Sequence, residues 1–288
     1  GHKDPVYLTD LISKEDITIV HFVPSMLGSF TKHTNKSIDS LRYIFCSGEA
    51  LNLDQVRKCH KLLPHTEVHN LYGPTEASID VLSYNCTGKE IDKVCIGRPI
   101  HNISVYVLSN DLCLLPVGAI GELYIGGVGL ARGYLNNQEL TNERFIANPF
   151  QTEEEKLDTE LYGALGRNAR LYKTGDLVRW LPDGNLEYIG RNDFQVKIRG
   201  YRIELGEIEN QLIGYEGINQ AVVITKEVKG GVEGVEGSKY LVGYYISEVK
   251  LDEGEILKYL ESKLPDYMVP SILVRMDKLP LTVNGKLD

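Results

Sequence analysis

The sequence predicts a mixed α/β protein with a parallel sheet, a β-barrel-like second part and a small α+β domain. Between residues 17 and 72, apolar β-branched runs alternate with helical patterns, which is typical of a parallel sheet. From residue 81 to about 190, short strands are broken by Gly and Pro, which favours a small barrel or a twisted antiparallel sheet. After Arg191, strands and helices alternate over about one hundred residues, the size of a small domain.

These changes of pattern divide the chain into two expected domains. A larger part covers residues 1–192, with the parallel sheet in 1–80 and the barrel-like part in 81–192. A small C-terminal domain covers residues 193–288.

The parallel part is expected to contain three strands and two helices. Apolar or β-branched runs predict strands at 17–23, 41–48 and 67–73. A proline that suits a first helical turn opens the helix expected at 24–33, and an amphipathic pattern predicts a second helix at 53–63. Because ligands of such sheets bind at the carboxyl ends of the strands, polar residues at those ends are expected to share a site.

The second part is expected to consist mainly of strands. Residues 94–109, 121–127 and 185–191 have strand patterns, and LPDG at 181–184 has the composition of a hairpin turn. Residues 151–169 are charged and poorly periodic, so we expect an excursion on the surface.

Composition limits the classes of function. The chain has 288 residues, of which 42% are apolar, enough for a sizeable core. Its net charge is −9 with both signs interspersed, which gives no support for binding nucleic acid or an anionic membrane. Five scattered cysteines without a CxxC pair favour free thiols over disulfides or a zinc site. Since there is no apolar run of roughly 20 residues and no signal-peptide pattern, we expect a soluble, cytoplasmic protein.

One short stretch, NLYGPTEASID at residues 70–80, contains more chemistry than a turn requires. Gly73 and Pro74 suffice for the turn itself. Thr75 could cap a following helix and Glu76 could lie in its first turn, which is the purely structural interpretation. The alternative is that the aromatic ring, the hydroxyl and the carboxylate belong to a ligand site.

Six segments, in order along the chain, resemble the sequence motifs of one family. They are NLYGPTE (70–76), GELYIGGVGLARGYL (121–135), YKTGDL (172–177), GRNDFQVKIRGYRIELGEIE (190–209), LPDYMVP (264–270) and NGKLD (284–288). The chain resembles the adenylation domains of nonribosomal peptide synthetases, which share a larger family with acyl-CoA ligases and luciferases. The resemblance runs over most of the chain.

This resemblance implies a reaction in two steps. A carboxylate and ATP, with Mg²⁺, give an acyl-adenylate and pyrophosphate, and the acyl group then passes to the phosphopantetheine thiol of a carrier protein. Attack by a weak carboxylate nucleophile must be assisted by positioning and charge stabilisation. Family members also carry a phosphate loop and a Phe-Asp motif upstream, and neither is present in these 288 residues. The chain alone is therefore not expected to hold the complete site.

The resemblance assigns the 70–76 motif to the nucleotide. Asn70 matches the residue that hydrogen-bonds the adenine amino group, and Tyr72 matches the residue that stacks on the ring. Thr75 matches a contact to the α-phosphate, and Glu76 matches the Mg²⁺ ligand, a hard oxygen for a hard cation. The same assignment includes two glycines, Gly48 and Gly73.

Three further residues are assigned to the nucleotide by resemblance. Asp176 in YKTGDL matches the carboxylate that accepts hydrogen bonds from both ribose hydroxyls. Arg191 matches a residue that reaches the ribose or a phosphate. Tyr188 flanks the nucleotide in the family, although simple packing explains it equally well. The GGVGLARGYL segment (126–135) does not fit a phosphate-binding fingerprint, and we assign it a structural turn without chemistry.

The small domain is expected to contribute by moving. Lys286 in NGKLD matches the catalytic lysine that bridges the substrate carboxylate and the α-phosphate, although a lone lysine is ordinarily a solvated surface charge. Asp193 matches the family's hinge. Rotation there would remove Lys286 and bring the 194–200 loop, with Lys197, to the site for thioester formation.

The resemblance also identifies positions of the amino-acid pocket. They are His21, Phe45, Ser47, Leu71, Ile79 and Asp80, with Lys286 as a further member. This pattern resembles that of serine-activating domains. The apolar members could narrow the pocket, and the polar members could pair with a substrate hydroxyl, whose absence in alanine would leave them unpaired. Alternatively, His21 and Ser47 merely satisfy backbone groups of the sheet.

Other functions and partners follow from the same resemblance. An acyl-CoA or aryl-acid ligase shares the first half-reaction, and a non-catalytic fragment that binds nucleotide or a partner is the alternative of another class. The expected partners are a peptidyl carrier protein and neighbouring synthetase domains, with an MbtH-like protein in some relatives. No nucleic acid or membrane partner is expected.

Overall fold

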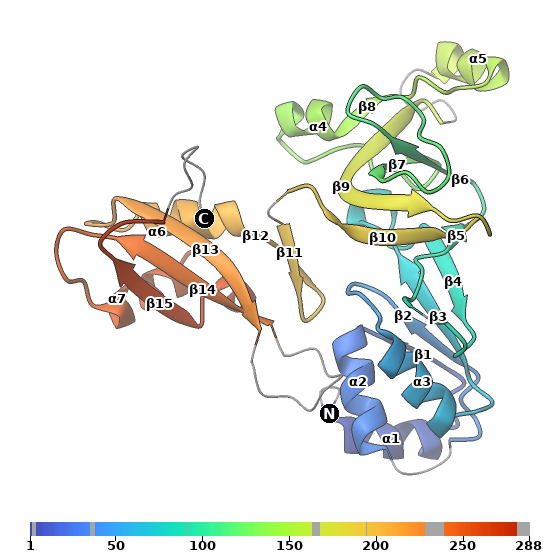
Figure 1. Ribbon diagram of the computed structural model, residues 1–288, viewed down its shortest axis with the longest axis horizontal. Helices are drawn as coiled ribbons and strands as arrows, with labels where there is room; N and C mark the ends of the chain where they lie inside the picture. Colours follow the sequence, from blue (N-terminus) through green and yellow to red (C-terminus); the bar gives the residue numbers. More distant parts are fainter. Residues whose placement is uncertain are drawn as a thin grey trace. The chain divides into compact units, whose positions relative to one another are not determined.

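The computed structural model describes residues 1, 4–34, 38–90, 92–162, 168–193, 195–227 and 239–280. The chain divides into two compact units, Gly1–Asp193 and Phe194–Asp288 (Figure 1). A search of the described residues finds no helix with the length and apolar character needed to cross a bilayer.

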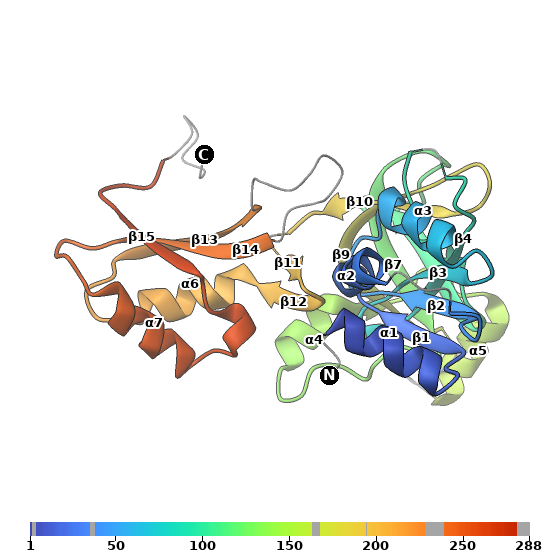
Figure 2. The same ribbon diagram turned by 90° about the horizontal axis from the view of Figure 1, so that it is seen from below.

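The first unit begins with a five-stranded sheet in the order β1-β2-β3-β4-β5. As predicted, its first three strands are parallel; the two added at the β3 edge are antiparallel, so the sheet is mixed. Helices α1, α2 and α3 pack side by side, and their apolar residues share one core with the sheet (Figures 1 and 2). The elements are α1 (Pro5–Lys14), β1 (Ile19–Phe22), α2 (Pro24–His33), β2 (Tyr43–Cys46), α3 (Leu53–Leu62), β3 (Glu67–Tyr72), β4 (Leu82–Cys86) and β5 (Arg98–Pro99).

Local sequence explains where these helices begin. Pro24 occupies the first position of α2, where a missing N–H costs nothing. At α3 the Asn52 side chain accepts from the Gln55 backbone, and the Gln55 side chain accepts from the Asn52 backbone, which forms a capping box. The Asp4 carboxylate caps α1, a helix that was not expected from the sequence.

A second, antiparallel sheet completes the first unit in the order β10-β9-β7-β6, with β8 paired to β9. The expected hairpin at 181–184 is confirmed: the Leu181 and Asn185 backbones pair across it. Helices α4 and α5, which lie in this region, were not expected from the sequence. Closure of the sheet into a barrel stays a prediction. The elements are β6 (Ile103–Leu108), β7 (Gly121–Gly127), α4 (Gln138–Arg144), β8 (Phe145–Ala147), α5 (Glu153–Tyr162), β9 (Arg170–Trp180) and β10 (Leu186–Arg191).

One apolar cluster joins the two sheets of the first unit. Tyr72 and Leu82 from the first sheet share it with Leu123, Val178 and Leu186 from the second. The carboxyl end of β3 therefore lies against β9 and β10, which brings the 70–76 motif to the YKTGDL strand.

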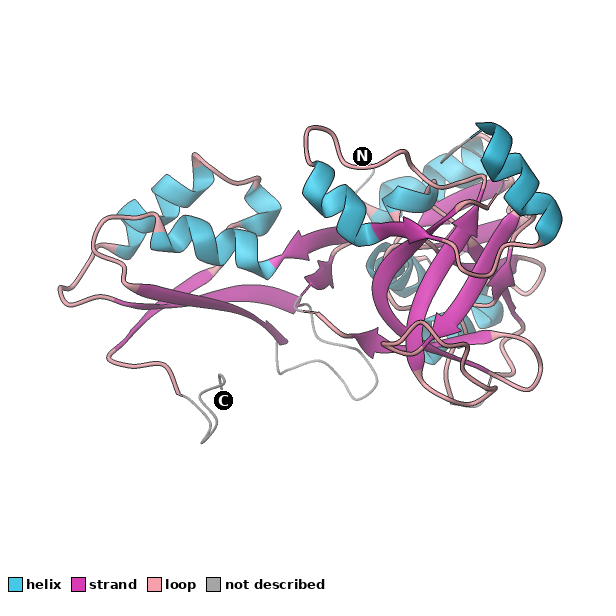
Figure 3. Ribbon diagram, turned by 90° about the horizontal axis from the view of Figure 1, so that it is seen from above, coloured by secondary structure: helices cyan, strands magenta, loops and turns pink. Residues whose placement is uncertain are grey.

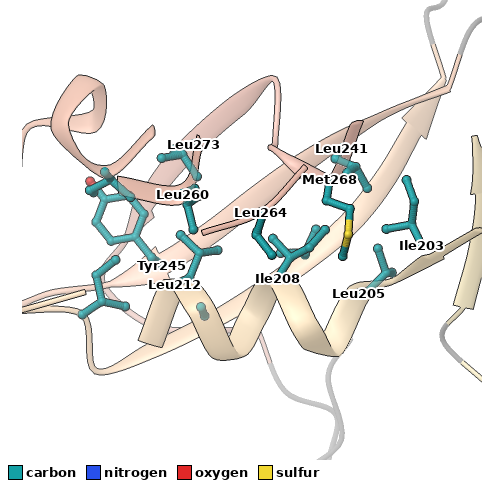
Figure 4. Packing of buried hydrophobic residues seen from close by; sticks show 14 of the residues in the cluster. Ile203, Leu205, Ile208, Leu212, Leu241, Tyr245, Leu260, Leu264, Met268 and Leu273 are labelled. Atoms are coloured by element: carbon teal, nitrogen blue, oxygen red, sulfur yellow. The ribbon is translucent and has the colours of Figure 1, made fainter. Parts of the chain in front are cut away.

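The second unit is an α+β domain with its own core. Its helices lie on one face of a three-stranded sheet (Figure 3), and buried aliphatic residues, Met268 and Tyr245 fill the space between them (Figure 4). A two-residue turn, Arg199-Gly200, with both φ positive, joins the hairpin that precedes α6. The elements are β11 (Gln195–Ile198), β12 (Tyr201–Glu204), α6 (Leu205–Ile213), β13 (Gln220–Glu227), β14 (Lys239–Ile246), α7 (Glu253–Glu261) and β15 (Ile272–Met276).

Candidate active site

The segment after β3 folds back tightly on the strand that precedes it. The Val81 amide donates to the Tyr72 carbonyl at 2.8 Å, which closes a loop over residues 73–80. A Cβ on Gly73 would lie 2.2 Å from the Ile79 carbonyl oxygen, so only glycine fits there. Thr75 is exposed and begins a short 3₁₀ turn whose N-cap is Pro74. The structural interpretation that Thr75 caps a helix is therefore wrong.

Two consecutive residues of this loop adopt left-handed backbone conformations. Ser78 has φ 63° and Ile79 has φ 78°, the latter uncommon for a β-branched side chain. The Ser78 hydroxyl donates to the Gly129 carbonyl at 2.7 Å, which fixes the strained pair from outside the loop. Backbone strain of this kind persists only where the surroundings impose it, and it concentrates at functional sites.

A buried polar network connects β3 to the β9–β10 hairpin. The Tyr72 hydroxyl donates to Oδ2 of Asp176, and Arg191 Nη1 donates to Oδ1 of the same carboxylate at 2.7 Å. Nε and Nη2 of Arg191 each donate to an oxygen of Asp193 at 2.6 Å. Three of the predicted nucleotide residues, Tyr72, Asp176 and Arg191, are thus brought together, and Asp193 continues the network.

The charges in this network stabilise one another. Burial, followed by the nearby Asp176 carboxylate, raises the pKa of Tyr72 well above its ordinary value, so its hydroxyl remains a donor. Burial also raises the pKa of Tyr188 to about 12, and this side chain packs against the cluster between the sheets. For Arg191, burial lowers the pKa, but the Asp193 hydrogen bonds and the two carboxylate charges outweigh this, and the net shift is upward.

Asn70, the other residue predicted to contact adenine, lies two positions before Tyr72 on β3. Asn70 is buried on the same face of β3, and its side-chain amide donates to the Cys95 carbonyl at 2.8 Å. Gly48 follows β2 with φ 87°, a conformation that favours glycine. A hydrogen bond between Asn70 and the adenine amino group stays a prediction.

Glu76 is held by a residue to which the sequence pattern assigned no chemistry. The Tyr134 hydroxyl donates to Oε1 of Glu76 at 2.7 Å, and the Ala131 amide donates to the Glu76 carbonyl at 2.8 Å. Among the described residues, no group of three His, Cys, Asp or Glu side chains is arranged to hold a metal. A single half-buried carboxylate nevertheless fits Mg²⁺, which usually binds one or two carboxylates together with substrate phosphates.

Three polar residues predicted for the pocket lie close together near the carboxyl ends of the parallel strands. His21 Nε2 and Ser47 Oγ are 2.8 Å apart, so the two side chains hydrogen-bond each other rather than only the sheet backbone. Oδ1 of Asp80 is buried, and no hydrogen-bond partner for it is found among the described residues. Burial raises the pKa of Asp80, and the nearby His21 partly opposes this shift.

The apolar pocket positions differ in exposure. Phe45 is half-buried and packs its ring against His69, with centroids 5.3 Å apart, and Leu71 is also half-buried. Ile79 has 65% of its surface exposed.

Two predicted residues belong to the second unit. Lys197 lies on β11 in register with Arg202 of β12. Lys286 lies outside the described residues. Their catalytic roles and a hinge at Asp193 stay predictions.

The sequence did not predict that Tyr134 and Arg170 support Glu76. Arg170 donates to the Ala131 and Arg132 carbonyls, each at 2.9 Å, and so holds the segment that carries Tyr134. The sequence did give a signal for Tyr134, which lies within the 121–135 segment that resembles a family motif, but the contact of Tyr134 with Glu76 spans 58 residues.

Comparisons with known families agree with this arrangement. The family model for the AMP-binding enzyme matches residues 1–135, and the family model for the AMP-binding enzyme C-terminal domain matches residues 207–286. The chain therefore belongs to the AMP-binding enzyme family. Within that family it is part of an adenylation domain of the nonribosomal peptide synthetase type.

Individual relatives support the narrower assignment. The chain is 41% identical to tyrocidine synthase 3 of Brevibacillus parabrevis, over 99% of this chain and 4% of that protein. It is similar to holo-PA1221, an NRPS protein containing adenylation and PCP domains (28% identity, TM-score 0.81, 99% of this chain and 46% of that one). It also resembles holo-AB3403, a four-domain synthetase bound to AMP and glycine (36% identity, TM-score 0.57, 100% of this chain and 20% of that one). The chain thus spans less than half of each of these proteins.

Proposed function

We propose that the protein containing this chain activates an amino acid with ATP and loads it on a carrier protein. The observation that carries the proposal is the buried network of Tyr72, Asp176 and Arg191, which joins the two motifs expected to hold the nucleotide. A carboxylate at this place suits a ribose diol, because it can accept two hydrogen bonds at once.

The chemistry asked of the site is a displacement at the α-phosphorus. A carboxylate oxygen of the amino acid forms a bond to phosphorus while the bond to pyrophosphate breaks, which gives aminoacyl-AMP. Tyr72, with Asn70 and Tyr188, would hold the base, and Gly48 and Gly73 would let the backbone approach it. Bound Mg²⁺ would neutralise charge on the phosphates, and Glu76 would ligate it.

The remaining roles fall to the exposed loop and the second unit. Thr75, exposed at the start of the 3₁₀ turn, would contact the α-phosphate. Lys286 would bridge the carboxylate and the α-phosphate, where its charge opposes the negative charge that builds. After rotation at Asp193, Lys197 would serve the second step, in which a phosphopantetheine thiol attacks the acyl carbon and AMP leaves.

We propose serine as the amino acid. His21, Ser47 and Asp80 can exchange hydrogen bonds with a small hydroxylated side chain, and the unpartnered Oδ1 of Asp80 can accept from its hydroxyl. Phe45, Leu71 and Ile79 would limit its size. An analogue that lacks the hydroxyl would leave the buried Oδ1 of Asp80 without this partner, so alanine should be rejected strongly.

Amino-acid-dependent ATP–pyrophosphate exchange by the intact adenylation domain tests the proposal. Exchange dominated by serine supports both the reaction and the pocket, whereas exchange with another amino acid keeps the reaction and removes the serine assignment. Thioester formation on free CoA without a carrier protein favours an acyl-CoA or aryl-acid ligase. No exchange from a folded domain supplied with an MbtH-like protein favours the non-catalytic alternative.

A further inference from the structure

We propose that Tyr134 and Arg170 are positioning residues that hold Glu76 for the metal–nucleotide complex. The inference rests on the proposed function, because it concerns the carboxylate assigned to Mg²⁺. It assigns chemistry to the 126–135 segment, for which the sequence pattern predicted only a structural turn.

The hydroxyl of Tyr134 sets the orientation of the Glu76 carboxylate. It donates to Oε1 at 2.7 Å and lies 3.5 Å from the Tyr172 hydroxyl. A carboxylate has about four lone-pair directions, so this bond leaves capacity for a cation.

The backbone around Tyr134 is fixed from several sides. The Tyr134 amide donates to Thr141 Oγ1 at 2.9 Å, and a Cβ on Gly133 would lie 2.5 Å from a Thr141 carbon. The tyrosine ring packs edge-on against Phe145, with centroids 5.8 Å apart. The hydroxyl therefore has little freedom to leave Glu76.

Arg170 completes the support. Its guanidinium donates to two successive carbonyls, those of Ala131 and Arg132, and lies over the Phe145 ring at 5.3 Å. The Ala131 amide in turn donates to the Glu76 carbonyl, so Arg170 reaches the Glu76 backbone through one residue. Lysine lacks the planar fork needed to hold both carbonyls.

Such support matters because a side chain that must reorganise before it binds a metal binds that metal with lower affinity. Changing the partner of a metal-binding side chain typically weakens metal affinity by about 10- to 100-fold. We therefore expect Tyr134→Phe to weaken binding of Mg²⁺-ATP by about 10-fold, with metal-free ATP binding changed by less than about twofold. Arg170→Lys should act in the same direction with a smaller effect.

Calorimetric titration of the intact adenylation domain with ATP, with and without Mg²⁺, provides the test. Two variants are matched controls. Tyr106→Phe removes a hydroxyl on β6 that accepts a hydrogen bond from Asn168, and Arg179→Lys replaces a guanidinium that donates to Glu187. They should leave both affinities unchanged. Urea unfolding of each variant separates positioning from loss of fold.

Three results would overturn the inference, and they are distinguishable. Equal loss of Mg²⁺-ATP and metal-free ATP binding by Tyr134→Phe would make its role structural. Unchanged Mg²⁺-ATP binding would show that Glu76 does not depend on Tyr134. If the unmodified domain binds ATP equally well with and without Mg²⁺, the metal role of Glu76 itself fails, and the positioning role with it.

Discussion

The Tyr72 hydroxyl donates a hydrogen bond to Asp176 across 104 positions of sequence. Both residues are buried, with 6% and 4% of their surfaces exposed. This bond joins the end of a parallel strand in one sheet to the middle of β9 in the other. The nucleotide site proposed for this protein therefore depends on how the two sheets meet, as well as on either motif.

Removing that hydroxyl should cost stability. Tyr72→Phe keeps the ring but leaves Asp176 with one buried partner fewer, so the free energy of unfolding should fall by about 1–3 kcal/mol. Urea unfolding measures the change, with Tyr43→Phe on the half-exposed face of the first sheet as the control, expected within about 0.5 kcal/mol. Equal stability of Tyr72→Phe and the unmodified protein would mean that the hydroxyl contributes nothing to the fold.

Adding a single methyl group at Gly73 should also be costly. Its Cβ would lie 2.2 Å from the Ile79 carbonyl oxygen and 2.8 Å from the Asp80 Cα, so the loop must shift. We expect Gly73→Ala to lower the free energy of unfolding by about 1–3 kcal/mol and to weaken nucleotide binding. Gly190→Ala is the matched control, since its Cβ would have no neighbour within 4 Å among the described residues, apart from the adjacent residues of the chain. A similar, small effect of both changes on urea unfolding would refute the close approach.

The raised pKa of Asp80 predicts a pH-dependent effect on stability. Because its pKa is higher in the folded chain than in the unfolded chain, the ionised carboxyl costs stability at neutral pH. This cost disappears as pH falls below the unfolded value of about 3.9. Asp80→Asn should therefore raise the urea midpoint at pH 7, and the gain should shrink towards pH 4. A gain or loss independent of pH would contradict the stated origin of the shift, which is burial opposed by His21.

Much of the fold could be predicted from the sequence because the local signals for helices and turns were strong. The proline at the start of α2 and the LPDG hairpin both carry unambiguous backbone preferences, and both predictions are confirmed. Asp4 followed by Pro5 is a readable start signal for α1, although this helix was not predicted. Helix α4 has only seven residues, too few for a periodic pattern to stand out.

The candidate site could be predicted only in part from the sequence, because its contacts depend on strand register and on segments that are distant in the chain. In the β9–β10 hairpin, Trp180 pairs with Leu186, but a register shift between Tyr188 and Gly190 is needed to place Arg191 opposite Asp176. A regular hairpin would put Gly190 there instead. Such a bulge, like the contact of Tyr134 with Glu76, has no local signature in the sequence.

The nucleotide affinity of Asp176→Asn tests the proposed site most directly. The substitution keeps the size of the side chain but removes the charge that Arg191 and Tyr72 share, so we expect AMP and ATP to bind the intact adenylation domain about 10-fold more weakly. The control is Asp183→Asn, which changes an exposed residue in the turn of the same hairpin. This variant should bind AMP and ATP with unchanged affinity. Unchanged affinity in a folded Asp176→Asn variant would contradict the assignment of this network to the nucleotide.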